Sequence, residues 1–568
     1  MLNENAMLKR HVRWYISFAL GAFFGALVFI SLYGVRILDV TYDDWLLTGW
    51  YDLSQHYAGW QLYRASAWHF PFGLCDTSLY PYLASVIYTD SIPIVCLLLK
   101  IISPLLPPVF QFFGLYGLFC FMMQGGVAKL LLRRVVKTEA QCCVAVIPFL
   151  FCAPLWQRMY YHTALASHYL ILIAILFFVY RDKVRALWKR ILLWCALGAL
   201  CISVHFTIYG MVSVMLLGFA LWEALDGAGR SEGRLRKIRS GVLIFLSFLT
   251  AYLAATVLTF YLFGGFYGGI SGVSDGLGSY SANLNSLFNP IDYSRIIKEL
   301  PLIDCQYEGL SYIGIAAVIF ELPALIGITK NLRLLWSKRR NEIISGIVTS
   351  AALWVIALSP IVTFGSIVLF EIPVPDFIYD VWSLFRASGR FLWPVMYAVI
   401  LINIYFARDE LKAFFVPVLV AGCLLQLFEF SEKVTVISRK YENLKDAHFT
   451  ADSLDLYDFE GIEHLQFMHD YYFGEFYQDS NRDQLIGYTE FALRNGMTVS
   501  NFHFSRDDME KVWQWIDRSD AKLREGMPDR DTIYMFRNED VDKDEVLEKY
   551  SGVTWIFTDK EMIAVPER

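Results

Sequence analysis

Twelve apolar runs dominate this chain and constrain its fold more than any other feature, because a membrane-spanning helix needs about 20 consecutive apolar residues. The runs occupy residues 14–35, 85–103, 109–132, 141–157, 164–180, 188–205, 207–225, 240–263, 310–329, 343–370, 391–407 and 412–430. Only 18% of all residues are charged, against about 25% in soluble proteins. This composition excludes a disordered, collagen-like or nucleic-acid-binding chain and predicts a polytopic α-helical membrane protein.

The distribution of basic residues predicts how many of these runs cross the bilayer. The run 85–103 contains Asp90, Pro93 and Lys100, so we expect a helix that lies along the outer surface. If the other eleven runs cross, all the main basic clusters fall on one side, at residues 9–13, 133–137, 181–190, 230–239, 330–340 and 408–412. The positive-inside rule then predicts about eleven spans, a retained first anchor and a cytoplasmic N-terminus.

The charge balance divides the chain at residue 430. Residues 431–568 carry 17 basic and 30 acidic residues, whereas residues 1–430 carry a net positive charge. We therefore expect a membrane body over 1–430 and an extracytoplasmic α/β domain over 431–568, where strand-like and helix-like segments alternate. The body then presents outer loops at 37–108, 158–163, 264–309 and 371–390. The predicted location is the cytoplasmic membrane.

No motif in the sequence indicates a resident cofactor. The ten Cys are scattered without a CxxC pair, which argues against a zinc site or a disulfide framework. The chain also lacks a phosphate-binding glycine loop and a nucleophile elbow. We expect no metal ligands, and leave a divalent cation open as an alternative.

The loop after the first span contains the strongest candidates for chemistry. Acidic residues occur at Asp44 and Asp52, and residues 52–64 have the pattern of an interfacial helix on which Asp52 and His56 share a face. Arg64 lies at the end of the same segment. An aromatic belt with solvated carboxylates is the competing interpretation.

Three further outer segments contain polar candidates. Arg158 and His162 lie near the outer ends of two spans, where a side chain can also simply snorkel to the interface. The loop 264–309 offers candidate sugar-hydroxyl ligands, for which turn capping is an equal alternative: Asn283, Asn285, Gln306 and Glu308. Arg386 and Arg390 are four residues apart at the start of a span, so a helix would place both on one face. Ser388 and Gly389 would let a phosphate approach the backbone there.

The layout resembles the GT-C superfamily of integral-membrane glycosyltransferases, and most closely a bacterial branch of it. The segments that carry the resemblance are YDLSQHYAGWQLYRASAWHFPFG, YTDSIP, RMYYHTALASHY, NLNSLFNPIDYSRI, QYEGLSYIG and FRASGRFLWP. They span nearly the whole chain. The acidic pair typical of the superfamily after the first span is replaced here by Asp43 and Asp44, while Asp52 lies in the more distinctive stretch.

The resemblance implies an enzyme that transfers a sugar, with inversion, from a polyprenyl-phosphate donor to a glycan or polymer acceptor of the cell envelope. Asp52 or Asp44 would serve as the base, and Arg386, Arg390 and Arg158 would bind the donor phosphate. His56, Arg64, His162, Asn285, Gln306 and Glu308 would contact substrate. The competing functions are a lipid or glycan transporter or flippase, and an acyl- or phosphotransferase.

Overall fold

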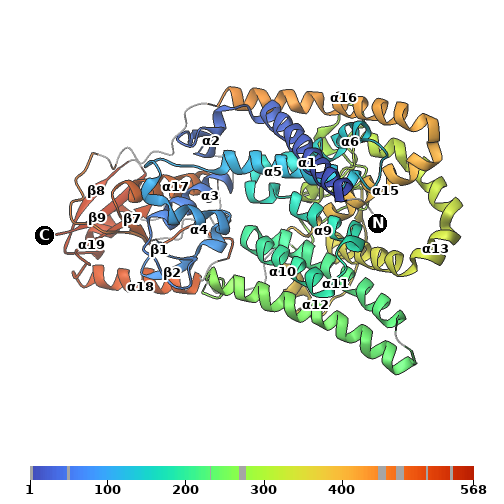
Figure 1. The fold of residues 1–568 in the computed structure, drawn as a ribbon. Helices are drawn as coiled ribbons and strands as arrows, with labels where there is room; N and C mark the ends of the chain where they lie inside the picture. The colour runs from blue at the N-terminus through green and yellow to red at the C-terminus, as the bar shows by residue number, and fades with distance from the viewer. Residues whose placement is uncertain are drawn as a thin grey trace. The chain divides into compact units, whose positions relative to one another are not determined.

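The chain folds into two compact units (Figure 1). The computed structural model describes residues 4–47, 52–230, 232–267, 277–444, 454, 456–468, 479–506, 509–537, 542–558 and 560–567. The first unit comprises Met1–Val40, Phe112–Val257 and Gly272–Asn443, and the second comprises Thr41–Gln111, Leu258–Ser271 and Leu444–Arg568. The predicted boundary at residue 430 kept the first outer loop with the membrane body. In the structure, residues 41–111 group with the tail.

The first unit is almost entirely helical. Its helices are α1 (Glu4–Tyr33), α5 (Phe113–Leu132), α6 (Glu139–Ala145), α7 (Ile147–Leu150), α8 (Ala153–Tyr161), α9 (Tyr169–Val179), α10 (Leu187–Val204), α11 (Phe206–Gly229), α12 (Arg234–Leu262, ending in the second unit), α13 (Ile315–Leu358), α14 (Asp376–Ser383), α15 (Trp393–Leu411) and α16 (Phe415–Glu442). A small hairpin of β3 (Ile361–Phe364) and β4 (Ile367–Glu371) follows α13. Short 3-10 turns η4 (Thr163–Ala166), η7 (Gln306–Gly309) and η8 (Ser388–Leu392) join the helices.

Several helices of this unit have the length and composition of membrane spans. Within the described residues, seven stretches are long and apolar enough to cross a bilayer, or eight if the bent pair of Glu139–Leu150 and Ala153–Tyr161 counts as one span. Their lipid-facing sides expose large apolar side chains such as Leu243, Leu258 and Leu424. The chain is therefore a multi-pass membrane protein.

Close helix packing in this unit depends on small residues. Gly21 and Gly25 of α1 are one turn apart and face α5, where a Cβ on Gly21 would lie 2.2 Å from the carbonyl oxygen of Gly125. The backbones of α1 and α5 can approach this closely only because both positions lack a side chain. Figure 1 shows the two helices side by side.

The second unit contains the predicted α/β fold. The loop contributes α2 (Asp44–Leu47), α3 (Asp52–Ala65), β1 (Leu74–Leu79), β2 (Tyr82–Ser85) and α4 (Pro93–Ile101). The tail contributes β5 (His464–Phe467), α17 (Asp479–Arg494), β6 (Thr498–Val499), α18 (Met509–Arg524), β7 (Thr532–Arg537), α19 (Lys543–Lys549), β8 (Val553–Phe557) and β9 (Glu561–Pro566). The five tail strands form a mixed sheet in the order β6-β5-β7-β9-β8. Strands β6, β5 and β7 are parallel, and β9 is antiparallel to both neighbours.

The first loop packs on this sheet as part of the same core. Tyr80, in the turn between β1 and β2, donates its backbone N–H to the carbonyl of Val499 at 2.9 Å. Gln55 of α3 donates to the backbone carbonyl of His503 at 3.0 Å. The run 85–103 forms the nine-residue helix α4, which buries Cys96 and exposes Leu98 and Ile101.

Candidate functional site

A buried cluster of two arginines and one glutamate lies in the first unit. Glu308 of η7 accepts from Arg158 of α8 and from Arg390 of η8, with Arg158 Nη2 at 2.9 Å and Arg390 Nε at 2.8 Å from Glu308 Oε2. The side chains of all three residues are at most 13% exposed. The structure therefore joins three residues that the sequence had identified in three separate loops.

Glycine backbones bring η7 and η8 into contact. A Cβ on Gly389 would lie 2.7 Å from the Cα of Gly309, and the N–H of Gly389 donates to the carbonyl of Tyr280 at 3.0 Å. Since Glu308 and Arg390 each adjoin one of these glycines, the close approach of the two turns pairs their side chains. The predicted role of Gly389 in admitting a phosphate is therefore corrected: the space beside Gly389 is filled by Gly309 and Ser281.

The two arginines determine the ionisation of Glu308. Burial alone would raise the pKa of Glu308, but the guanidinium groups of Arg158 and Arg390 more than offset this effect and hold that pKa at about 2. The carboxylate is therefore ionised at neutral pH and pairs with both guanidinium groups. Among the described residues, the buried Nε of Arg158 has no hydrogen-bond partner. A bound anion beside Arg158 would satisfy this donor.

A chain of polar and aromatic side chains continues from the cluster. Trp393 at the start of α15 lies 6.0 Å from the Arg158 guanidinium, and the ring of His168 packs on Trp393 at 4.3 Å. His168 Nδ1 shares a hydrogen bond of 2.7 Å with the hydroxyl of Tyr397. Within the described part of the chain, the buried His168 Nε2 has no partner. Trp393 and Tyr397 were not predicted as site residues, because an aromatic residue in an apolar run resembles ordinary core.

Arg386 differs from Arg390 in its surroundings. Residues 384–387 are not helical, because α14 ends at Ser383 and η8 begins at Ser388. The predicted helix face shared by the two arginines is therefore wrong. Arg386 is exposed and lies over the ring of Tyr280 at 4.7 Å.

The amides of the loop 264–309 hold the loop itself together; residues 268–276 of this loop lie outside the described chain. Gln306 donates to Thr363 Oγ1 at 2.8 Å and to Ser281 Oγ at 3.1 Å, and accepts from Asn283 at 2.9 Å. Asn285 donates to the carbonyl of Pro301 at 3.2 Å. These contacts explain the amides by loop packing, the alternative interpretation of the sequence.

The remaining candidate of the first unit is a histidine. His162 follows α8, is 5% exposed, and packs edge-on against His205 with ring centroids 4.8 Å apart. The two rings thus form a buried aromatic pair between the end of α8 and the start of α11.

The carboxylates of the first outer loop lie in the second unit. Asp44 and Asp52 are the first residues of α2 and α3, and both are half-buried. Within the described residues, the Asp52 side chain makes no hydrogen bond or ion pair. Asp43 instead accepts a hydrogen bond of 2.7 Å from Tyr57. Among the described residues, the carboxylate of Asp52 therefore has an unoccupied capacity to accept a proton or a hydrogen bond.

A glutamate of the tail shares this acidic environment. Burial and then the charge of Asp43 raise the pKa of Glu490 on α17 to about 8, with Arg494 acting in the opposite direction. The charge of Glu490 also contributes to raising the pKa of Tyr57. Sequence analysis missed this group, since no local pattern links α17 to the first loop.

Arg64 and His56 are framework residues of α3. The Arg64 guanidinium donates to the carbonyls of Pro107 and Pro108 at 2.8 and 2.9 Å and to Ser103 Oγ at 3.0 Å. These bonds fasten α3 to the segment that precedes α5. His56 is fully buried, and its backbone carbonyl accepts from Ser91 Oγ at 2.7 Å.

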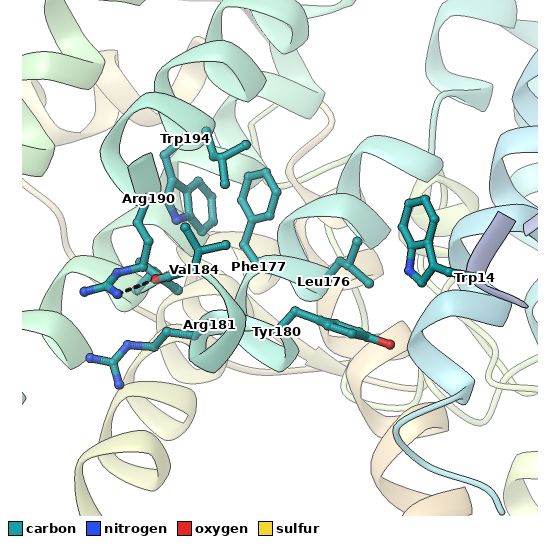
Figure 2. Close-up of a pocket in the computed structure, with 10 residues that line it drawn as sticks. Trp14, Leu176, Phe177, Tyr180, Arg181, Val184, Arg190 and Trp194 are labelled. Carbon is teal, nitrogen blue, oxygen red and sulfur yellow. Dashed lines mark hydrogen bonds between the residues drawn. The ribbon is translucent and has the colours of Figure 1, made fainter. Parts of the chain in front are cut away.

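A separate apolar pocket opens among α9, α10 and α11 (Figure 2). Half of the residues that line it are aromatic, including Trp14, Phe177 and Trp194. Arg181 and Arg190 stand at one end, and both pair with Glu223, at 2.6 and 2.8 Å. None of the predicted site residues lines this pocket.

Comparison with known families assigns most of the chain. Residues 22–431 match the family described as "Domain of unknown function (DUF6311)", and residues 459–564 match the DUF6311 C-terminal domain. The chain therefore belongs to the DUF6311 family. No curated protein matches it.

Proposed function

We propose that this member of the DUF6311 family is a glycosyltransferase of GT-C-like architecture. It would move a sugar from a polyprenyl-phosphate donor to a cell-envelope glycan or polymer on the outer face of the membrane. The observation that carries the proposal is the buried Arg158–Glu308–Arg390 cluster, because the buried Nε of Arg158, which has no hydrogen-bond partner among the described residues, suits an oxygen of a phosphate monoester or diester.

The proposal includes eleven spans. α13 has 44 residues and is interrupted by non-helical backbone at Arg339, and its length of about 66 Å is twice the thickness of a bilayer core. The stretch Ser388–Glu442 likewise breaks at Lys412, whose φ is +50°. Counting two spans in each, together with the bent pair and α9, gives eleven and keeps the basic clusters on the cytoplasmic side.

The exposed apolar side chains of the first loop fit a location at the outer face of the cytoplasmic membrane. Leu98 and Ile101 of α4 are 57% and 61% exposed, and Leu105 beyond it is 85% exposed. Trp68 and Phe70 in the same unit are also more than half exposed. Such residues suit the interface between lipid and water, where a lipid-linked donor would present its sugar.

The chemistry requires a base and a site for the leaving phosphate. A carboxylate accepts the proton of the acceptor hydroxyl while the oxygen of that hydroxyl attacks the anomeric carbon of the sugar. The bond from that carbon to the phosphate oxygen breaks, and polyprenyl phosphate leaves with the electron pair. Asp52 or Asp44 is proposed as the base. Arg158 and Arg390 would stabilise the phosphate as its negative charge grows.

The test uses purified full-length protein in nanodiscs with a panel of polyprenyl-phosphate sugars. Replacing the base should lower turnover about 100-fold or more with donor binding kept, so Asp52→Asn is compared with Asp44→Asn. Asp458→Asn, an exposed tail residue, is the matched control. Full activity in both loop variants would remove the carboxylate mechanism for this loop. Arg390→Lys keeps the charge but loses the fork geometry, and should weaken donor binding.

Transport is a second candidate function, favoured by the polar residues inside the helical unit. Gln124 of α5 donates to the hydroxyl of Tyr397 at 3.0 Å, and Tyr397 also contacts His168. Polar networks of this kind within spans occur in transporters. Sealed proteoliposomes separate the two: a transporter moves the lipid-linked sugar across the bilayer, whereas a transferase consumes it without transport.

A further inference from the structure

Three metal-binding residue types meet where two parallel strands of the tail sheet begin. They are Glu463, His464 and Asp531, whose ligand atoms all lie within 4.8 Å of one another. The backbone N–H groups of Glu463 and His464 both donate to the carbonyl of Asp531, at 2.8 and 3.0 Å. The pairing of β5 with β7 therefore fixes the three residues together independently of their side chains.

The imidazole of His464 is held in one orientation. Its Nδ1 shares a hydrogen bond of 2.9 Å with Thr498 Oγ1, and its ring stacks on Tyr80 at 3.6 Å. Its Nε2 is turned toward Asp531 Oδ2 at 3.9 Å, which is too long for a hydrogen bond. Metal-binding histidines are commonly held in this way, with one ring nitrogen on a polar partner and the other directed at the ion.

The spacing fits two ligands of one ion. Zinc bonds of about 2.0–2.2 Å to nitrogen and oxygen place neighbouring ligands of a tetrahedral ion about 3.4 Å apart. The His464–Asp531 separation needs only a small side-chain movement to reach this value. The nearby Asp529 is already engaged by Lys522 at 2.7 and 2.8 Å, so it is not counted as a ligand.

We propose that Glu463, His464 and Asp531 bind a divalent zinc ion, with water completing the coordination. Imidazole favours Zn²⁺ over Mg²⁺ and Ca²⁺, and the two carboxylates supply the compensating charge. The ion clamps the start of β5 to the start of β7 at the point where Tyr80 of the first loop stacks on His464. This site is independent of the proposed sugar transfer.

The test measures Zn²⁺ affinity of the full-length protein in micelles, by competition with a chromophoric chelator. His464→Ala and Asp531→Asn should each lower the affinity by about 10-fold or more. Thr498→Val, which removes the partner of Nδ1, should lower it about 10- to 100-fold, as outer partners of ligating histidines do. Asp529→Asn removes a neighbouring negative charge but no ligand, and should lower the affinity less than His464→Ala or Asp531→Asn.

The outcomes are distinguishable even where a variant is unstable. Thermal unfolding of each variant without metal identifies misfolding, and Thr498→Val then provides the informative comparison, since it leaves all three ligands in place. Equal Zn²⁺ affinity in the wild type, His464→Ala and Thr498→Val would overturn the proposal. So would the absence of Zn²⁺ binding by the wild type, or binding lost only through Asp529→Asn.

Discussion

Replacing Glu308 by glutamine tests the electrostatics of the buried cluster directly. Glutamine keeps the size and shape of the side chain but removes the charge between Arg158 and Arg390. Two guanidinium groups are then left buried with no carboxylate between them. We therefore expect Glu308→Gln to destabilise the first unit.

Two routes give a similar magnitude. Lowering the pKa of Glu308 from its ordinary 4.5 to about 2 corresponds to about 3 kcal/mol of native-state stabilisation. Removing one partner of a buried ion pair costs about 3–5 kcal/mol. The matched control is Glu342→Gln, because Glu342 pairs with Arg339 at 3.4 Å on the surface, with side chains 40% and 56% exposed. An exposed pair contributes about 0–1 kcal/mol.

The assay is unfolding in mixed micelles by increasing SDS, followed by tryptophan fluorescence at neutral pH and in a pH series. Because the folded pKa of Glu308 is below the unfolded one, its contribution is complete above about pH 4.5 and is lost as the pH falls toward about 2. Glu308→Gln should lack this acid-dependent part. A loss at neutral pH no larger than that of Glu342→Gln would refute the reasoning.

Three further predictions concern other parts of the chain. Gly21→Ala should destabilise the first unit, because its Cβ would collide with the carbonyl of Gly125. Gly346→Ala on α13, where a Cβ meets nothing within 4 Å, should be neutral or stabilising by up to about 1 kcal/mol in the same SDS titration. The raised pKa of Glu490 means that stability falls as the pH rises from about 4.5 to about 8, and Glu490→Gln should flatten this part of a pH series of thermal unfolding. A cysteine at the exposed Glu548 of α19, in a background without the native cysteines, should react with an impermeant maleimide in intact cells or spheroplasts; labelling only after lysis would contradict the proposed topology.

Local patterns predicted much of the fold. Apolar runs identify helices because the composition of a membrane span is dictated by its solvent. Alternation and turn residues predicted a mixture of strands and helices in the tail, and the structure has a five-stranded sheet with helices there. The run 85–103 was expected not to cross, and it contains a helix of only nine residues that begins at Pro93. These signals are contained in neighbouring residues and do not depend on the rest of the chain.

The candidate site was predicted only in part, because its geometry depends on distant contacts. Arg158, Glu308 and Arg390 were each identified as candidates, but their mutual pairing follows from the contact between Gly309 and Gly389. A helical spacing rule placed Arg386 beside Arg390 and failed, since the turn around Ser388 packs against other loops instead of continuing a helix. Glu490 had no local signal at all.

The grouping of the first loop with the tail has a consequence for how this chain must be dissected. Hydropathy separates residues by their solvent and therefore drew a boundary at 430, but it carries no information on which polar segments pack together. Gln55 bonds the segment after β6, Tyr80 stacks on His464, and the backbone of Tyr80 bonds Val499. A tail expressed alone would leave the partners of these residues exposed. Truncation at 430 would likewise remove the core on which α3 is packed, and Asp52 is the first residue of α3. A loss of activity in such a truncation would therefore report on the loop as much as on the tail.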